Sequence, residues 1–156
     1  MVISLNKKFK KFENEIKKTA LKILKILNKD KIAVEIYLTD NKKMRILNKK
    51  FRNKDKTTTV LSFEEPRNFI LPPSKFNYLG EIYLNCEKRF KIVNTSVSTD
   101  AKFVDSHKFV VSHRYLLIHG LLHLFGYDHK KESDRIKMEK KEKYVYHRLR
   151  FRNIAN

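Results

Sequence analysis

The sequence predicts an α+β fold, in which a single domain packs about five helices against a small β-sheet. Two kinds of apolar pattern lead to this prediction, because some segments repeat every second residue and others repeat every three to four. The 156 residues suffice for one domain with a core, and 41% of them are apolar, including 11 Phe and 7 Tyr. We expect the most apolar helix at the centre of the domain, and this helix carries histidines.

The first half of the chain is expected to contain two helices and two strands. Apolar residues at helical spacing, with lysines between them, predict a helix over 6–27. Residues 31–38 alternate as a strand does, and Asp40 can cap a short helix that ends at Phe51. β-Branched and apolar residues predict a second strand over 57–63. The inner face of the short helix is predicted to hold Met44, Ile46, Leu47 and Phe51.

The second half is expected to contain one strand and three helices. Three prolines indicate a loop over 64–78 that could border a functional site, and a third strand follows over 79–84. Helices are predicted over 86–97, 105–125 and 132–151, of which the second is apolar on nearly every side. The inward positions of the last helix are predicted to be Ile136, Tyr144, Val145 and Leu149.

Charge and cysteine content narrow the choice of partner and compartment. The net charge of +19, from 36 Lys+Arg and 17 Asp+Glu, favours a polyanionic partner. An A+T-rich codon bias would also enrich Lys, Asn and Ile, so the charge alone does not establish function. The single Cys86 excludes an intramolecular disulfide and fits a reducing cytosol. Neither a membrane-spanning apolar run nor a signal peptide is found, so we expect a cytoplasmic protein.

Residues 119–129 read His-Gly-Leu-Leu-His-Leu-Phe-Gly-Tyr-Asp-His and predict a metal site. His119 and His123 are four residues apart, so on a helix their rings lie on one face. Gly126 can end the helix in the left-handed conformation, and the turn after it can bring His129 back toward the first two. Three neutral imidazoles suit one Zn²⁺ per chain, or another divalent metal, with a fourth position left for water. An open fourth position indicates catalysis.

The offsets of the three histidines are those of metzincin proteases. Those enzymes carry a Glu after the first His as general base, and here that position is Gly120. A zinc metallopeptidase-like hydrolase is therefore an alternative that lacks its base. The plainer interpretation is that the histidines lie beside a leucine-rich core face. Gly120 within a helix costs up to about 1 kcal/mol relative to Ala, which predicts a close approach by another element.

A basic turn precedes the second predicted strand. Arg52 can present a planar fork of donors to a phosphate, and Lys54 and Lys56 can add point charges. Taken alone, such a segment is more often a solvated charged turn. Among the other polar residues, Asp128 is expected either to orient a metal ligand or to stabilise the turn before His129. The remaining histidines, His107, His113 and His147, are not expected to bind metal.

Together, the basic turn and the histidine stretch make the chain resemble the YbeY family of bacterial endoribonucleases. The resemblance rests on three blocks in the family's order, which are residues 52–63, 79–82 and 119–129. It implies a zinc-dependent enzyme that cleaves single-stranded RNA, with a small mixed sheet packed by helices. By position, it implies His119, His123 and His129 as the metal ligands and Arg52 as the catalytic arginine. Arg52, Lys54 and Lys56 are the residues expected to contact RNA.

The resemblance also implies a biological role and exposes some departures. It implies maturation of the 16S ribosomal RNA 3′ end and ribosome quality control, with the small ribosomal subunit and its assembly factors as partners. Thr57 stands where the family usually has Pro, Glu81 where Asp is usual, and Glu64 where Pro often occurs. The non-enzyme alternative is a ribosome-assembly factor with a structural metal. That alternative needs a fourth protein ligand, and Cys86 is the only thiol.

Overall fold

The computed structural model describes residues 1–66, 75–87 and 113–151. Its strands are β1 (Val2–Ser4), β2 (Ile32–Thr39), β3 (Val60–Glu64) and β4 (Asn77–Asn85). Its helices are the 3₁₀ helix η1 (Lys7–Phe12) and the α-helices α1 (Glu13–Ile26), α2 (Asn41–Arg52), α3 (His113–Leu124) and α4 (Glu132–Phe151). The predicted number of about five helices is close to the four α-helices of these ranges. The predicted helix over 86–97 lies almost wholly outside them.

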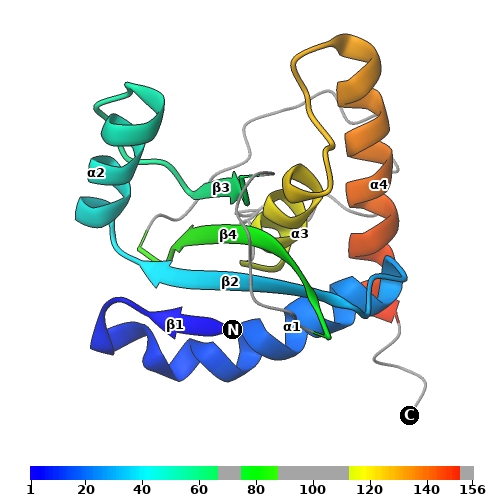
Figure 1. The fold of residues 1–156 in the computed structure, drawn as a ribbon, viewed down its shortest axis with the longest axis horizontal. Helices are drawn as coiled ribbons and strands as arrows, with labels where there is room; N and C mark the ends of the chain where they lie inside the picture. Colours follow the sequence, from blue (N-terminus) through cyan, green and yellow to red (C-terminus); the bar gives the residue numbers. More distant parts are fainter. Residues whose placement is uncertain (67–74, 88–112, 152–156) are drawn as a thin grey trace, which may run out of the picture.

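The four strands form one mixed sheet, which confirms the predicted α+β fold. The strand order is β1-β2-β4-β3 (Figure 1). β1, β2 and β4 run parallel, and β3 pairs antiparallel with β4 at the edge of the sheet. Side chains alternate between the two faces along β2 and β4, as the period of two predicts.

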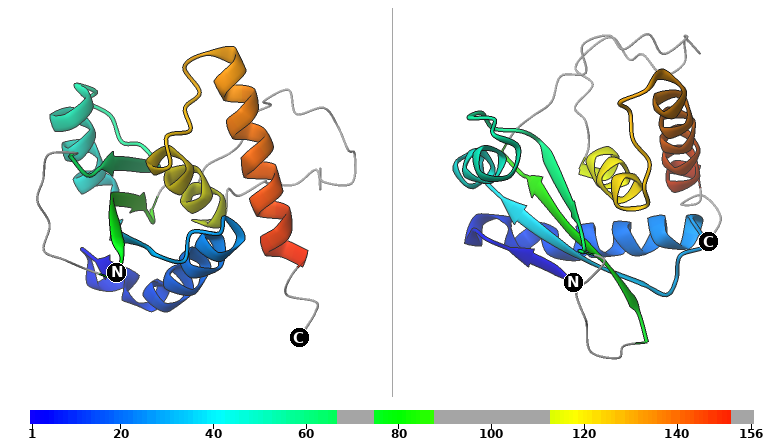
Figure 2. Two further views of the ribbon diagram at one scale, coloured as in Figure 1. Left: turned by 45° about the vertical axis from the view of Figure 1, so that its right-hand side comes forward. Right: turned by 45° about the horizontal axis from the view of Figure 1, so that its top comes forward.

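The two faces of the sheet are covered by different helices. α1, α3 and α4 lie on one side, where the apolar face of β2 and β4 forms the main core with them (Figure 2). α2 lies on the other side and packs Met44 and Leu47 against Leu61 of β3. Among the described residues, none of the helices combines the length and the apolar character that a membrane span requires.

Helix α3 is the buried central helix that the sequence predicts. It lies between the sheet and α4 (Figures 1 and 2), and most of its side chains belong to the main core. At Gly120 the helix approaches the sheet so closely that a Cβ would lie 3.1 Å from Ile82 Cγ2 and 3.1 Å from Ser62 Oγ. The Ser62 hydroxyl donates a hydrogen bond to the Gly120 carbonyl over 3.1 Å. The close approach expected at this glycine is therefore present, and it ties α3 to β3 and β4.

The predicted helix over 6–27 was wrong at its start. Residues 7–12 form a 3₁₀ helix, in which the Asn6 side chain accepts a hydrogen bond from the Lys8 backbone N–H. The α-helix begins at Glu13. Strand β1 was not predicted, because its three residues become a strand only by pairing with β2 from Val2 opposite Ile36 onward. Such a pairing leaves no local pattern in the sequence.

The predicted inner face of α2 was correct in two positions and wrong in two others. Asp40 caps this helix as predicted, through a 2.9 Å hydrogen bond from the Lys43 backbone N–H. Met44 and Leu47 are buried, whereas Ile46 and Phe51 are more than half exposed. The helix touches the sheet along one narrow stripe, so residues on either side of it reach solvent. The stripe consists of Met44, Leu47 and Asn48.

The predicted inner face of α4 was also partly wrong. Val145 and Leu149 are buried as expected, but Ile136 and Tyr144 are exposed. The buried stripe follows helical spacing from Met138 onward, two residues after the predicted start at Ile136. It consists of Met138, Glu142, Val145 and Leu149. A carboxyl group therefore lies on the core-facing side of α4.

The close approach at Gly120 predicts that a larger side chain there destabilises the fold. Gly120→Val should lower the free energy of unfolding by about 1–3 kcal/mol, because overpacking outweighs the few tenths of a kcal/mol by which Val exceeds Gly as a helix former. Urea unfolding measures the change. Lys143→Val, on the exposed side of α4, is the matched control for valine in a helix and should change stability far less. Equal effects of the two substitutions would show that α3 has room at this contact.

Candidate metal centre

Helix α3 places the first two histidines side by side on its solvent-reaching edge. His119 and His123 are one turn apart, and their Nε2 atoms are 3.0 Å from each other. Their rings meet edge to face, with centroids 4.5 Å apart. Both side chains are half-buried, because the neighbouring helix positions carry leucines that enter the core. The helix therefore presents two imidazole nitrogens to one point.

The end of α3 returns the chain so that the third histidine reaches the same point. The Gly126 N–H donates to the His123 carbonyl over 2.9 Å, and the Tyr127 N–H donates to the Leu122 carbonyl over 3.0 Å. These two bonds form a Schellman motif, in which Gly126 takes the required left-handed φ of 82°. His129 then lies with its ring centroid 5.0 Å from that of His123 and 5.6 Å from that of His119.

The donor set fits a divalent metal ion. One ring nitrogen from each of the three histidines lies within 4.8 Å of the other two. Two nitrogens bound to a tetrahedral zinc ion at about 2.0–2.1 Å are about 3.4 Å apart, which is near the 3.0 Å between His119 and His123. Within the described part of the chain, the three histidines are the group with metal-ligand spacing. His129 is exposed, so this side of the group faces solvent.

Burial keeps the His123 imidazole in the form that a metal ion requires. Burial, followed by the neighbouring His119 and His129, lowers the pKa of His123 to about 4. At neutral pH this imidazole is therefore uncharged, which is the form that donates a lone pair to a metal. The helix thus presents an imidazole that would not have to lose a proton before binding a metal.

A buried glutamate contacts the histidine group, and the sequence analysis missed it. The His119 Nδ1 lies 2.6 Å from Oε1 of Glu142 on α4. The Tyr115 hydroxyl donates to the other carboxyl oxygen of Glu142 over 2.7 Å. The signal that could have found Glu142 is its spacing of four residues after Met138 and three before Val145, which places it on the buried stripe of α4.

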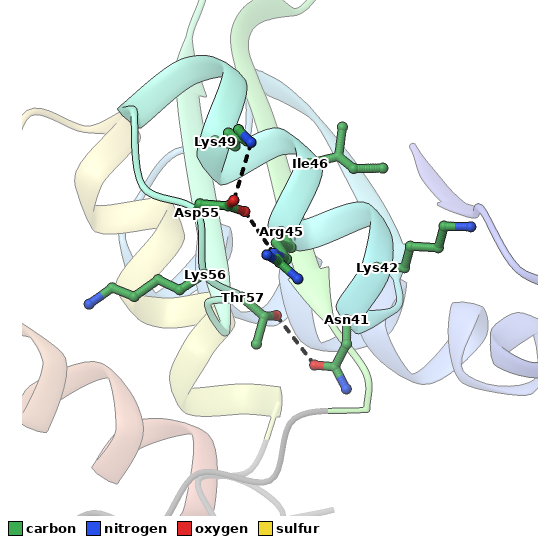
Figure 3. Close-up of a pocket in the computed structure, with 8 residues that line it drawn as sticks. All are labelled: Asn41, Lys42, Arg45, Ile46, Lys49, Asp55, Lys56 and Thr57. Carbon is green, nitrogen blue, oxygen red and sulfur yellow. Dashed lines mark hydrogen bonds and ion pairs between the residues drawn. The ribbon is translucent and has the colours of Figure 1, made fainter.

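The basic residues predicted for RNA contact lie in the segment that leads from α2 into the edge strand β3. Arg52, Lys54 and Lys56 are exposed at the end of α2 and in the turn after it. None of them contacts the three histidines in any interaction of the described residues. Lys56 lines a pocket against α2, in which Arg45 and Lys49 both reach Asp55 (Figure 3). We call this pocket the basic pocket; its lining is Asn41, Lys42, Arg45, Ile46, Lys49, Asp55, Lys56 and Thr57.

The remaining polar candidates have other roles in the structure. The Asp128 carboxylate accepts from the His129 backbone N–H over 2.7 Å and pairs with Lys130, so it stabilises the turn, one of its two expected roles. Burial raises the pKa of the Cys86 thiol to about 11, which makes it a poor ligand at neutral pH. His113 stacks against Phe12 with ring centroids 6.1 Å apart, away from the other histidines of α3. His107 lies outside the described residues.

Comparison with known proteins identifies the family of the chain. A family model described as endoribonuclease YbeY matches residues 2–150. The chain belongs to this family. Relatives named endoribonuclease YbeY include one from Pelagibacter ubique, 41% identical over 140 residues that cover 90% of this chain and 84% of the relative. Those from Aquifex aeolicus and Finegoldia magna are each 31% identical, and cover 92% and 78% of this chain and 87% and 71% of the relatives. A solution structure of a protein from Thermotoga maritima matches with a TM-score of 0.48 and 24% sequence identity. The match covers 96% of this chain and 92% of the Thermotoga chain.

The three blocks of sequence that resemble the YbeY family meet in space. Ser62, from the first block, is paired with Ile82, from the second, across the β3–β4 ladder. Both residues lie against Gly120, from the third block. Ser62 and Ile82 are 20 residues apart along the chain and Gly120 follows Ile82 by 38, yet the three converge directly beside His119. The motifs of this YbeY-family chain therefore build one structural unit around the histidines.

Removing one histidine of the group should remove the metal. We expect His123→Ala to lose bound Zn²⁺ or Co²⁺ during dialysis against a moderate chelator, because two imidazoles remain where three converged. Elemental analysis of the dialysed protein measures this. His113→Gln, on the same helix but outside the group, is the matched control and should keep one equivalent. Full retention of metal by His123→Ala would contradict a site made of these three histidines.

Proposed function

We propose that residues 1–156 act as one metal-dependent hydrolase domain, an endoribonuclease that cleaves single-stranded RNA in ribosomal RNA maturation. The observation that carries the proposal is the convergence of three imidazole nitrogens in a chain of the YbeY family. We assign its substrate as the 3′ end of 16S ribosomal RNA and its setting as the cytoplasm, with the small ribosomal subunit and its assembly factors as partners. Ribosome quality control is part of the same role.

His119, His123 and His129 would hold one Zn²⁺. Three imidazoles favour a borderline ion over the hard ions Mg²⁺ and Ca²⁺, which prefer oxygen ligands. When bound, such an ion polarises a phosphoryl oxygen and lowers the pKa of a water molecule toward neutrality. The chain's own contribution is to orient the three rings from α3 and its Schellman turn, and to leave the His129 side accessible to a substrate.

The surroundings of the three histidines favour phosphodiester cleavage over the alternatives. Gly120 stands where a metzincin peptidase has its general base, and the Glu142 carboxyl group is already engaged by His119 and Tyr115. A structural metal would need a fourth protein ligand. Among the described residues, the group of His, Cys, Asp and Glu side chains at metal-ligand spacing consists of the three histidines and includes no fourth side chain.

We assign to Arg52 the role of stabilising the negative charge that develops on the oxygens of the reacting phosphate. Its guanidinium is exposed in the last turn of α2 and has no ion pair or hydrogen bond among the described residues. An unpaired guanidinium can bind two phosphate oxygens at once, which a lysine cannot do. The Asn53 that follows takes a left-handed conformation with φ of 54°, and this turns the chain directly after Arg52.

The charge of α2 and its following turn fits an RNA backbone. Residues 41–57 carry eight Lys+Arg and one acidic residue, Asp55. Asp55 is engaged by Arg45 and Lys49, which together lower the pKa of its carboxyl group to about 2. Lys42 and Lys56 extend away from that ion-pair cluster (Figure 3). This surface can therefore neutralise phosphates without first breaking its internal ion pairs.

Arg52→Ala should reduce cleavage of single-stranded RNA by about 10²-fold or more and leave the metal content unchanged, since it removes a donor to the reacting phosphate. A gel assay with labelled single-stranded RNA, with and without chelator, measures cleavage. Lys50→Ala removes one charge two residues away and should stay near the wild-type rate. Unchanged turnover in Arg52→Ala would remove Arg52 from the mechanism but leave the metal site intact.

RNA affinity should fall steeply with salt. For single strands, the logarithm of the affinity falls with the logarithm of the salt concentration by about 0.7 for each phosphate neutralised. Lys56→Gln should therefore flatten this dependence by about 0.7, whereas Lys143→Gln on α4 should not change it. Fluorescence anisotropy with labelled RNA at several salt concentrations provides the slopes. A flat response of the wild-type chain would mean that the charge of +19 reflects composition and not RNA binding.

A further inference from the structure

Glu142 is the one buried acidic or basic side chain among the residues that the structure describes. It is 4% exposed, and it lies on the core-facing stripe of α4 between Met138 and Val145. A carboxyl group withdrawn from water is costly unless hydrogen bonds satisfy both of its oxygens. A well-packed apolar side chain of similar volume would usually be as stable or more stable at such a position. The need for a carboxyl group here must therefore arise from its partners.

Both oxygens of Glu142 are satisfied by side chains of α3. Oε1 lies within hydrogen-bond distance of His119 Nδ1, at 2.6 Å, and Oε2 accepts from the Tyr115 hydroxyl over 2.7 Å. Tyr115 precedes His119 by one helical turn, and the two rings are stacked with centroids 6.4 Å apart. Burial and the neighbouring Glu142 both raise the pKa of Tyr115, so its hydroxyl stays protonated and remains a donor.

This pairing determines which nitrogen of His119 faces the other histidines. Since a carboxylate only accepts hydrogen bonds, the Nδ1 of His119 carries the proton and Nε2 keeps its lone pair. Nε2 is the atom that lies 3.0 Å from His123 Nε2, on the side where the three rings converge. A carboxylate behind the ring also raises the basicity of the nitrogen that binds metal.

The two helices also share the main core. α3 contributes Leu117 and Leu121 to it, and α4 contributes Met138 and Val145. Glu139 lies three residues before Glu142 on α4. It shows the usual place of a glutamate on this helix, which is an ion pair at the surface. It pairs with Arg135 of the same helix over 2.6 Å at the surface and contacts none of the three histidines.

We propose that Glu142 is a positioning residue of the metal centre, which holds His119 in the tautomer and orientation that bind the ion, with Tyr115 supporting Glu142 from its other oxygen. This inference rests on the proposed function, because it assumes that the three histidines hold a metal. Glu142 touches neither substrate nor metal and acts only through His119.

The test is the zinc affinity of the full-length chain, measured by competition with a chromophoric chelator. Glu142→Gln keeps the size of the side chain and removes its charge, and it should lose about 10- to 100-fold in affinity. Glu139→Gln removes the same charge three residues away and should keep wild-type affinity. Tyr115→Phe should show a smaller loss in the same direction. With Co²⁺ in place of Zn²⁺, Glu142→Gln should also shift the visible absorption bands of the bound ion, which a change in packing alone would not do.

The outcomes separate the positioning role from the metal site itself. Wild-type affinity and an unchanged cobalt spectrum in Glu142→Gln, together with loss of metal in His123→Ala, would overturn the positioning role and leave the metal centre standing. Wild-type affinity in His123→Ala would overturn the metal centre and, with it, this inference. Should circular dichroism show that Glu142→Gln does not fold, Tyr115→Phe decides, and an unchanged affinity in that variant would overturn the proposal.

Discussion

The close contact of Gly120 with β3 and β4 fixes where α3 lies against the sheet. A helix that carried a side chain there would stand further from the sheet, because its Cβ would already meet Ile82, Ser62 and Val60 within 3.3 Å. The Ser62 hydroxyl completes the contact by donating to the Gly120 carbonyl. His119 directly precedes this point of closest approach. The position of the histidines is therefore set by the sheet and not only by the helix that carries them.

Two different requirements meet in α3, since it is both the central core helix and the carrier of two of the three clustered histidines. Its leucines enter the main core, while His119 and His123 occupy the one edge that reaches the surface. Half-burial keeps the imidazole of His123 uncharged at neutral pH, and Glu142 supplies a polar partner behind His119. Helix α2 lies on the opposite side of the sheet from α3, and its last residue, Arg52, begins the basic turn that leads into the edge strand β3.

Much of this arrangement could be predicted from local sequence, and the exceptions have physical causes. The alternation along β2 and β4, the cap at Asp40 and the turn at Gly126 are local features, and each is confirmed. β1 was missed because it depends on pairing with a strand 30 residues away. The inner faces of α2 and α4 were misjudged at Ile46 and Ile136, because apolar character alone does not tell which side of a charged helix meets the core. Glu142 was missed because the sequence alone does not show which side of α4 faces the core. Without that knowledge, a buried glutamate looks like the many exposed charged residues around it.

The proposed function requires a metal ion that three imidazoles hold and that keeps one position open to the substrate. X-ray absorption spectroscopy of the zinc-loaded full-length chain tests this most directly, because it counts and identifies the atoms bound to the ion. We predict three imidazole nitrogens and one further light atom at about 2.0–2.1 Å. A sulfur ligand at about 2.3 Å, which only a cysteine thiolate would place there, or fewer than three imidazoles would contradict the account.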